Sequence, residues 1–489
     1  MSARKINGRL VMWRSLGLGM LFSVACSTGG IKHMDFDYPT TALEDVRIKE
    51  FPISVQAWSF RKFTFVETLA KLRELGIENV QAYYDQKLGL PGEDPDARFH
   101  YQMTESQKTK IKAELDRLGI RVVAYGVVEK IGEADVRRLF TFAQEMGIEI
   151  VVMEPRWDDW TGIDELAEEY NLKVAIHNHK TPNKYARPEV VLSHLEGRSR
   201  RMGACADTGH WLRSGIVGKD GLRTLSGRVH DVHLKDFDEL GNLDANEVPF
   251  GQGKANGRDI LAELTLQNYA GYLTIEYEKE ADALDPSPAI REIIAFIDSV
   301  TYYKGYTQIL RSWDGRYNKH GWNHYGPGYF TLDETAGVLT GHGGMGLLWY
   351  SPKRLKDFVL ELEFLVEDDH DNAGIFYRIP DMPVSDDYIY HSFEIQIDGA
   401  ADDLHFTGAI YDAVAPSTKA TKAAGQWNHY KITCIGPNIT VVLNGEQVVD
   451  WDMEPRGKIR DWAKEGYIGL QNHGKNDTVH FRNIFMKEL

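Results

Sequence analysis

Residues 202–236 read MGACADTGHWLRSGIVGKDGLRTLSGRVHDVHLKD, and this stretch carries the pattern that decides the fold of the first half of the chain. Two short apolar segments, 202–207 (MGACAD) and 229–235 (VHDVHLK), lie on either side of the segment 208–228. Compact apolar runs of this kind are typical of strands buried on both faces of a parallel sheet. Both predicted strands have polar residues at or near their ends: Asp207 closes the first, and His233 lies near the end of the second.

The same alternation of short apolar strands and amphipathic helices runs from about residue 52 to residue 300. The segment 104–107 (TESQ) is a capping-box pattern that marks a helix start, and Gly76, Gly119 and Gly147 stand where left-handed caps would end helices. Eight such repeats over about 250 residues predict an α/β TIM barrel. The other six strands are expected at 53–60, 78–84, 120–127, 148–154, 172–178 and 271–277.

The pattern changes near Tyr302, beyond which alternating strands, glycine-rich turns and aromatic residues dominate. Asn444-Gly445 is a two-residue hairpin signal. The second half is therefore expected to be an all-β antiparallel sandwich, with strands at 358–366, 374–379, 392–398, 429–435, 439–443 and 447–451. We place the barrel at residues 45–302 and the sandwich at residues 305–489.

The first 25 residues have the features of a signal peptide. Four basic residues precede a short apolar stretch that ends in small residues. Cys26 follows directly, which resembles the bacterial lipobox whose cysteine is acylated, although Ser23 stands where leucine is usual. We therefore expect a lipid anchor in the bacterial cell envelope, at the periplasmic or outer-membrane surface. The alternative is an uncleaved signal with a chance cysteine.

Charge and cysteine content narrow the classes of partner. The formal net charge is −16, and removal of residues 1–25 would take away positive charges and no negative ones, so the remaining chain would be more acidic. An acidic surface repels phosphate backbones, which argues against nucleic acid as a partner. The two other cysteines, Cys205 and Cys434, are expected to be buried free thiols rather than part of a disulfide framework.

Polar residues end most of the predicted barrel strands, and functional groups of a TIM barrel gather at the C-terminal strand ends. Glu154, Asp207, His233 and Glu276 should therefore converge at the barrel mouth. This mixed nitrogen and oxygen set suits one divalent ion, namely Mn²⁺, Co²⁺, Mg²⁺, Ni²⁺ or Zn²⁺. A salt bridge or helix cap would explain each residue alone, but four such strand ends together favour a metal site.

These motifs resemble the xylose isomerase-like family of sugar isomerase and epimerase barrels. The matching segments are Val-Val-Met-Glu154-Pro, Ala-Asp207-Thr-Gly-His210, Val-His233-Leu-Lys-Asp and Thr-Ile-Glu276-Tyr. The resemblance implies that Glu154, Asp207, His233 and Glu276 hold one metal ion and that the two glutamates exchange protons with a sugar carbon. It also implies that His210 contacts a substrate hydroxyl.

Three further residues near the barrel mouth are expected to take part. Lys235 would place a positive charge near a developing oxyanion. The alternative for this lysine is an ion pair with a nearby aspartate, namely Asp231, Asp236 or Asp238. His177 and His179 either contact the substrate or support the ligands from behind.

The second half resembles the concanavalin A-like family named for 3-keto-disaccharide hydrolases. The resemblance rests on Trp313-Asp314-Gly315, Asn372-Ala-Gly-Ile-Phe-Tyr-Arg378, Phe-Glu394-Ile-Gln396-Ile-Asp398, Thr-Gly-Ala-Ile-Tyr411 and Gly469-Leu-Gln471-Asn-His473. Glu394 and Gln396 share one strand face because side chains alternate with period two. That face is either solvated or the floor of a sugar-binding groove. The resemblance favours a groove that includes Arg378, Tyr411 and His473.

The two resemblances together predict an enzyme that acts on 3-keto-glycosides. A carbonyl at C3 acidifies the C2 proton, and the C1 aglycone lies β to that carbonyl, so a metal-assisted base can drive elimination. Hydration of the enone product would be a further step after the cleavage. The alternatives are a sugar isomerase or epimerase that acts on free ketoses and uses the sandwich for binding, and a lipid-tethered glycan-binding protein with an inactive barrel.

Overall fold

The computed structural model of the chain describes residues 42–129, 131–157, 160–310, 312–313 and 316–489. Residues 53–275 contain a closed barrel of parallel strands in the order β1-β12-β9-β8-β7-β6-β5-β2. The strands are β1 (Ile53–Gln56), β2 (Asn79–Ala82), β5 (Arg121–Val128), β6 (Ile150–Met153), β7 (Lys173–His177), β8 (Met202–Asp207), β9 (Val229–Leu234) and β12 (Tyr272–Ile275). Each lies within a segment predicted as a strand, or differs from it by one residue, so the TIM barrel is confirmed.

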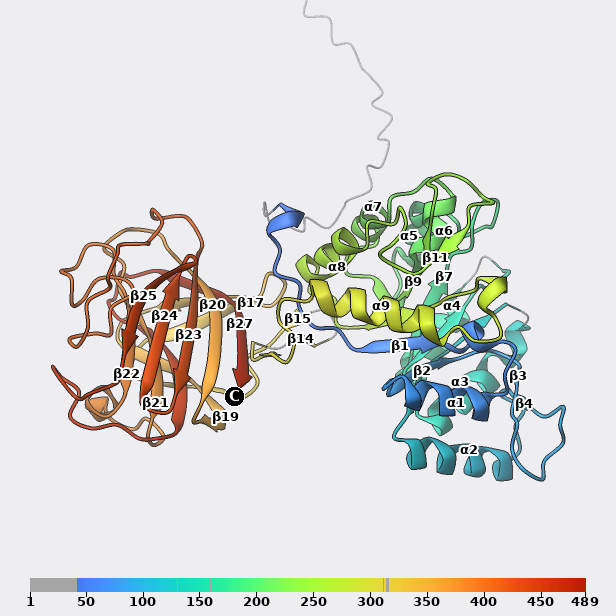
Figure 1. Cartoon of the computed structure of the whole chain (residues 1–489), viewed down its shortest axis with the longest axis horizontal. Helices are drawn as coiled ribbons and strands as arrows, with labels where there is room; N and C mark the ends of the chain where they lie inside the picture. The colour runs from blue at the N-terminus through green and yellow to red at the C-terminus, as the bar shows by residue number, and fades with distance from the viewer. Residues whose placement is uncertain (1–41, 130, 158–159, 311, 314–315) are drawn as a thin grey trace, which may run out of the picture. The chain divides into compact units, whose positions relative to one another are not determined.

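Local signals in the sequence explain where the barrel helices begin and end. Thr104 and Gln107 make both hydrogen bonds of the capping box at the start of α2, and Gly119 ends that helix in the left-handed conformation at φ 65°. Gly147 ends α3 in the same way, at φ 72°. The helices are α1 (Phe65–Glu74), α2 (Glu105–Leu118), α3 (Val136–Met146), α4 (Thr161–Tyr170), α5 (Pro188–Leu195), α6 (Thr208–Arg213), α7 (Gly218–Thr224), α8 (Gly257–Leu266) and α9 (Ser287–Val300). Figure 1 labels the helices α1 to α9 of this half of the chain.

The C-terminal half contains two antiparallel sheets, as expected for a sandwich. One sheet has the order β17-β18-β27-β20-β23-β24-β25, with β13 (Thr307–Gln308) paired to β27. Its strands are β17 (Tyr329–Asp333), β18 (Val338–His342), β27 (Val479–Glu488), β20 (Phe358–Val366), β23 (Asn428–Ile435), β24 (Asn438–Leu443) and β25 (Glu446–Trp451). Asn444 and Gly445 make the tight turn between β24 and β25 with φ values of 52° and 89°.

The other sheet has the order β16-β19-β26-β21-β22. Its strands are β16 (Trp322–Tyr325), β19 (Gly346–Leu355), β26 (Gly466–Asn472), β21 (Ala373–Ile379) and β22 (Phe393–Ile397). Apolar side chains from both sheets form one buried cluster, and Leu347, Trp349 and Phe376 belong to a second cluster. The sandwich therefore has a core between its sheets and an additional apolar patch on the five-stranded sheet.

The remaining described strands are two residues long: β3 (Gln86–Lys87), β4 (Arg98–Phe99), β10 (Asp236–Phe237), β11 (Glu247–Val248), β14 (Ser312–Trp313) and β15 (Arg316–Tyr317). Cys205 and Cys434 are both free and buried, as predicted. Over the described ranges, no helix is both long and apolar enough to cross a bilayer. Cys26, the segment 1–25, Asp314 and Gly315 lie outside the described residues.

Candidate active site and metal centre

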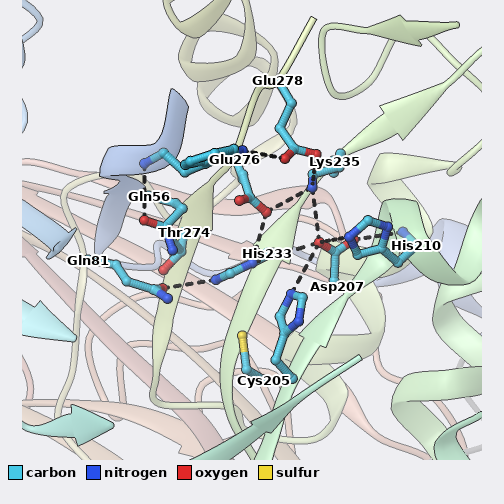
Figure 2. Close-up of polar contacts among 12 residues, drawn as sticks. Gln56, Gln81, Cys205, Asp207, His210, His233, Lys235, Thr274, Glu276 and Glu278 are labelled. Carbon is cyan, nitrogen blue, oxygen red and sulfur yellow. Dashed lines mark hydrogen bonds and ion pairs between the residues drawn. The ribbon is translucent and has the colours of Figure 1, made fainter. Parts of the chain in front are cut away.

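Four polar side chains meet at the C-terminal ends of neighbouring barrel strands. His177 and Asp207 are the last residues of β7 and β8, His233 lies in β9, and Glu276 directly follows β12. The register places Asp207 beside His233. One ligand atom from each of the four residues lies within 4.8 Å of the others, and all four side chains are buried. Figure 2 shows Asp207, His233 and Glu276 pointing toward one another.

Four atoms that face the centre of this group make no hydrogen bond, although Lys235 forms ion pairs with the two carboxylate oxygens among them. The four atoms are His177 Nε2, Asp207 Oδ2, His233 Nδ1 and Glu276 Oε2. His233 Nδ1 lies 3.0 Å from Glu276 Oε2 and 3.8 Å from Asp207 Oδ2, and His177 Nε2 lies 3.6 Å from the same aspartate oxygen. A buried polar atom without a partner is costly. Two imidazole nitrogens and two carboxylate oxygens fit one divalent cation, which would satisfy all four atoms.

Residues behind the two histidines orient the imidazole rings. Gln81 Oε1 lies 2.9 Å from His233 Nε2, and Glu154 Oε1 lies 2.9 Å from His177 Nδ1. If these ring nitrogens carry the protons, the opposite nitrogens present lone pairs to the centre. Such supporting hydrogen bonds are characteristic of metal-bound histidines.

Glu154 occupies a different place from the other three predicted ligands. Its carboxylate contacts His177, His179 and Asn183, and it forms a second close group with the two histidines. Burial opposes ionisation of Glu154, but the hydrogen bonds from His177 and His179 outweigh it and hold the pKa of the carboxyl well below its ordinary value. The four-atom cluster thus contains His177 where the sequence pattern predicted Glu154.

Lys235 is buried among carboxylates. Its Nζ lies 2.6 Å from Glu278 Oε2, 2.9 Å from Glu276 Oε2 and 3.3 Å from Asp207 Oδ2. Burial alone would lower the pKa of Lys235, but the nearby carboxylates raise it well above its ordinary value. The lysine is therefore charged at the edge of the cluster, and its partners are not the three aspartates considered from the sequence.

His210 forms part of the wall above the cluster. Its backbone N–H donates to Asp207 Oδ1 at 2.7 Å, and its ring Nδ1 lies 2.6 Å from an Arg213 guanidinium nitrogen. Burial holds the pKa of His210 well below its ordinary value, so the ring is neutral. A neutral imidazole can exchange hydrogen bonds with a substrate hydroxyl, as the sequence resemblance implies for this residue.

A pocket of about 370 Å³ opens above the cluster, which lies within the size range of small-molecule sites. His177, His179, His210 and Glu276 line it, but Glu154 does not. It also contains residues that were not predicted, namely Gln56, Trp58, Tyr83, Tyr84, Asp85, Glu129 and Glu278. Glu129 directly follows β5, so the strand-end rule that indicated the other acids would also have indicated this one.

The predicted residues of the sandwich separate into two environments. Glu394 and Gln396 lie on β22 opposite Phe376 and Gly374 of β21, and both are buried. Lys458 Nζ lies 2.5 Å from Glu394 Oε2 and 3.9 Å from the centre of the Tyr411 ring, so it connects these two residues.

Arg378 and His473 have other surroundings. Arg378 is 1% exposed, and its guanidinium donates to the carbonyl oxygens of Lys356 and Gly436 at 3.0 and 2.6 Å. These contacts leave Arg378 in a structural position, which speaks against the predicted substrate contact. His473 pairs loosely with Asp477, at 3.7 Å.

Comparisons with known proteins match a different family to each half of the chain. Residues 69–300 match the model described as a xylose isomerase-like TIM barrel, and residues 310–487 match a 3-keto-alpha-glucoside-1,2-lyase-like domain. A 3-keto-disaccharide hydrolase of Bacteroides thetaiotaomicron is 26% identical over 281 residues, covering 47% of this chain and 94% of the relative.

Two solved structures from Parabacteroides distasonis are also similar. An uncharacterised protein is 32% identical over 51% of this chain and 98% of its own, with a TM-score of 0.43. A candidate glycosyl hydrolase is 26% identical over 38% of this chain and 99% of its own, with a TM-score of 0.32.

Proposed function

Because the chain joins a xylose isomerase-like TIM barrel to a 3-keto-disaccharide hydrolase-type domain, we propose that it cleaves 3-keto-glycosides by elimination. A base takes the proton from C2, the released electron pair forms the C1=C2 double bond, and the C1–O bond breaks. The aglycone oxygen takes up a proton from the protonated base or from water, so that the aglycone leaves as an alcohol, and water can add to the enone that remains.

The observation that carries this proposal is the group of two buried imidazoles and two buried carboxylates that converge beneath a pocket of about 370 Å³. A divalent cation bound there would stabilise negative charge that develops on the substrate carbonyl oxygen. The residues around it have the complementary tasks of binding the sugar, moving the C2 proton and excluding water.

The contacts distinguish the two glutamates that were expected to move protons. Glu276 lines the pocket, whereas Glu154 lies behind the rings of His177 and His179. We therefore assign proton removal at C2 to Glu276 and a supporting role to Glu154. Lys235 and His233 lie beside Glu276 and keep that carboxylate ionised despite its burial.

A chromogenic 3-keto-glucoside tests the proposal directly. We expect the purified chain to release the aglycone, to lose this activity with chelator and to regain it with a divalent ion. Substrate deuterated at C2 should react more slowly, because the C2–H bond breaks in the proposed step. Epimerisation of free ketoses without aglycone release would instead support the isomerase or epimerase alternative.

The sandwich is a second candidate for the cleavage step. The ion pair of buried Glu394 with partly buried Lys458 beside Tyr411 supports it, as does the description of the domain family that residues 310–487 match. Glu276→Gln and Glu394→Gln in the full chain distinguish the two sites. Barrel catalysis predicts a large loss of kcat with Glu276→Gln alone, whereas sandwich catalysis predicts that loss with Glu394→Gln.

A further inference from the structure

Three pockets of the barrel meet at one tryptophan. The pocket above the four-atom cluster, which we call the glycone pocket, has a volume of about 370 Å³. A second pocket of about 600 Å³ is lined by Phe63, Lys87 and Arg98, and we call it the Lys87 pocket. A third, of about 400 Å³, is lined by Arg213 and Phe237, and we call it the Arg213 pocket. Trp58 lines all three.

Contacts on several sides fix the position of Trp58. Its indole N–H donates to Glu278 Oε1 at 2.6 Å, and the other oxygen of Glu278 accepts from Lys235. The Tyr83 ring meets the indole edge-on at a centroid distance of 4.6 Å, and the Arg61 guanidinium lies 5.7 Å from the ring. The indole is therefore tied through two hydrogen bonds to the lysine that contacts the cluster.

The glycone pocket has two boundaries with neighbouring pockets, and they differ in whether a long substrate could extend across them. Glu278 and Trp58 separate it from the Arg213 pocket, and their carboxylate and indole groups are already joined to each other and to Lys235. Trp58, Tyr83 and Asp85 separate it from the Lys87 pocket. That boundary offers two partly exposed aromatic rings and an exposed carboxylate. The open direction for a long substrate is therefore past the two rings.

We propose that Trp58, together with Tyr83, determines specificity by receiving a ring-shaped aglycone that extends from the glycone pocket into the Lys87 pocket. This inference rests on the proposed function, because it takes the sugar that reacts to lie above the cluster. An aromatic side chain packs well against a flat ring, whether the C–H face of a second sugar or an aryl group. A methyl aglycone would be too short to use this surface.

The test uses unreactive glycosides, so that it does not depend on turnover. Binding of glucose, methyl glucoside, phenyl glucoside and cellobiose to the full chain is measured by calorimetry with and without Trp58→Ala. We expect wild type to bind phenyl glucoside or cellobiose about tenfold more tightly than methyl glucoside, and Trp58→Ala to remove most of that advantage. Trp58→Phe should restore part of it, and the two ring-bearing ligands show which kind of aglycone is preferred.

Trp427→Ala is the matched control, because Trp427 is a partly exposed tryptophan of the sandwich that lies beneath the Arg482 guanidinium. The inference is overturned if ring-bearing ligands have no advantage in wild type, if Trp58→Ala keeps that advantage, or if Trp427→Ala removes it instead. Failure of the proposed function has a different signature, because no aglycone would be released from any 3-keto-glucoside while the ring-dependent affinity remained.

Discussion

Gln81 allows a specific test of how the cluster is built, because it contacts His233, one of the four residues that would hold the ion, and does not face the centre itself. The side chain is fully buried on β2, and its Oε1 lies 2.9 Å from His233 Nε2 (Figure 2). Gln81→Leu removes this acceptor at similar volume, so His233 loses the partner that fixes its ring and its tautomer. Supporting residues of this kind typically change metal affinity by about 10- to 100-fold. We expect a loss of that size, which corresponds to about 1.4–2.8 kcal/mol.

Competition against a chromophoric chelator measures this affinity, and thermal unfolding with excess ion gives a second readout. The metal-dependent rise in melting temperature should shrink by roughly 3–11 °C. Gln86→Leu is the matched control, since buried Gln86 donates to Phe63 O and Thr68 Oγ1 away from the cluster. It should lower stability without changing affinity. Equal affinities for Gln81→Leu and wild type would refute the orientation of His233 described here.

The remaining predictions concern the ligands, the pH dependence of stability and the N-terminus. Asp207→Ala and His177→Ala should each abolish binding of about one divalent ion per chain in elemental analysis, whereas Glu154→Ala should only weaken it; full metal content in Asp207→Ala would place the site elsewhere. Burial raises the pKa of Glu247 from 4.5 to about 8, so its contribution to stability is complete below about pH 4.5 and is lost as pH rises through 8. Urea unfolding should therefore show that Glu247→Gln loses less stability than wild type between pH 5 and 9, and parallel curves would contradict this. Cys26→Ser should move the protein from the membrane fraction to the soluble fraction, and unchanged fractionation would contradict the prediction of a lipid anchor at Cys26.

The barrel was predictable because its signals are local. Apolar runs, the capping box at Thr104 and the glycine caps each act within a few residues, and strand ends in a TIM barrel always face one side. That rule places Asp207, His233 and Glu276 together correctly. Glu154 as a metal ligand stays a prediction, and its contact with His177 was not predictable, because both residues stand at strand ends. Which of them reaches the centre depends on a hydrogen bond between two side chains that lie 23 positions apart.

In the sandwich, too, contacts between residues that are distant in the sequence could not be predicted from local patterns. Strand alternation placed Glu394 and Gln396 on one face, and the pairing with Phe376 and Gly374 agrees with that. The position of Arg378 was not evident from its strand, because burial of a guanidinium depends on whether distant backbone carbonyls are free to accept its hydrogen bonds. Here Lys356 and Gly436 provide them.

The position of Lys235 on its strand explains which carboxylates it contacts. Asp231, His233 and Lys235 alternate along β9 and the residue after it, so they share a face. Asp231 is one layer lower and accepts from Thr274, while Asp236 accepts backbone N–H groups around Gly253. Lys235 therefore forms its ion pairs with Asp207, Glu276 and Glu278 instead.

Asp207, Glu276 and Glu278 carry three negative charges, and the ammonium of Lys235 cancels one of them. A divalent cation held by Asp207 and Glu276 would offset negative charge that Lys235 leaves unbalanced, and burying an unbalanced charge is costly. Without such a cation, protons can supply part of the balance: burial lowers the pKa of His233, but Cys205, Glu276 and Asp207 together raise it well above its ordinary value. A proton on His233 would occupy the lone pair that the metal needs. Metal binding should therefore release protons and strengthen as pH rises.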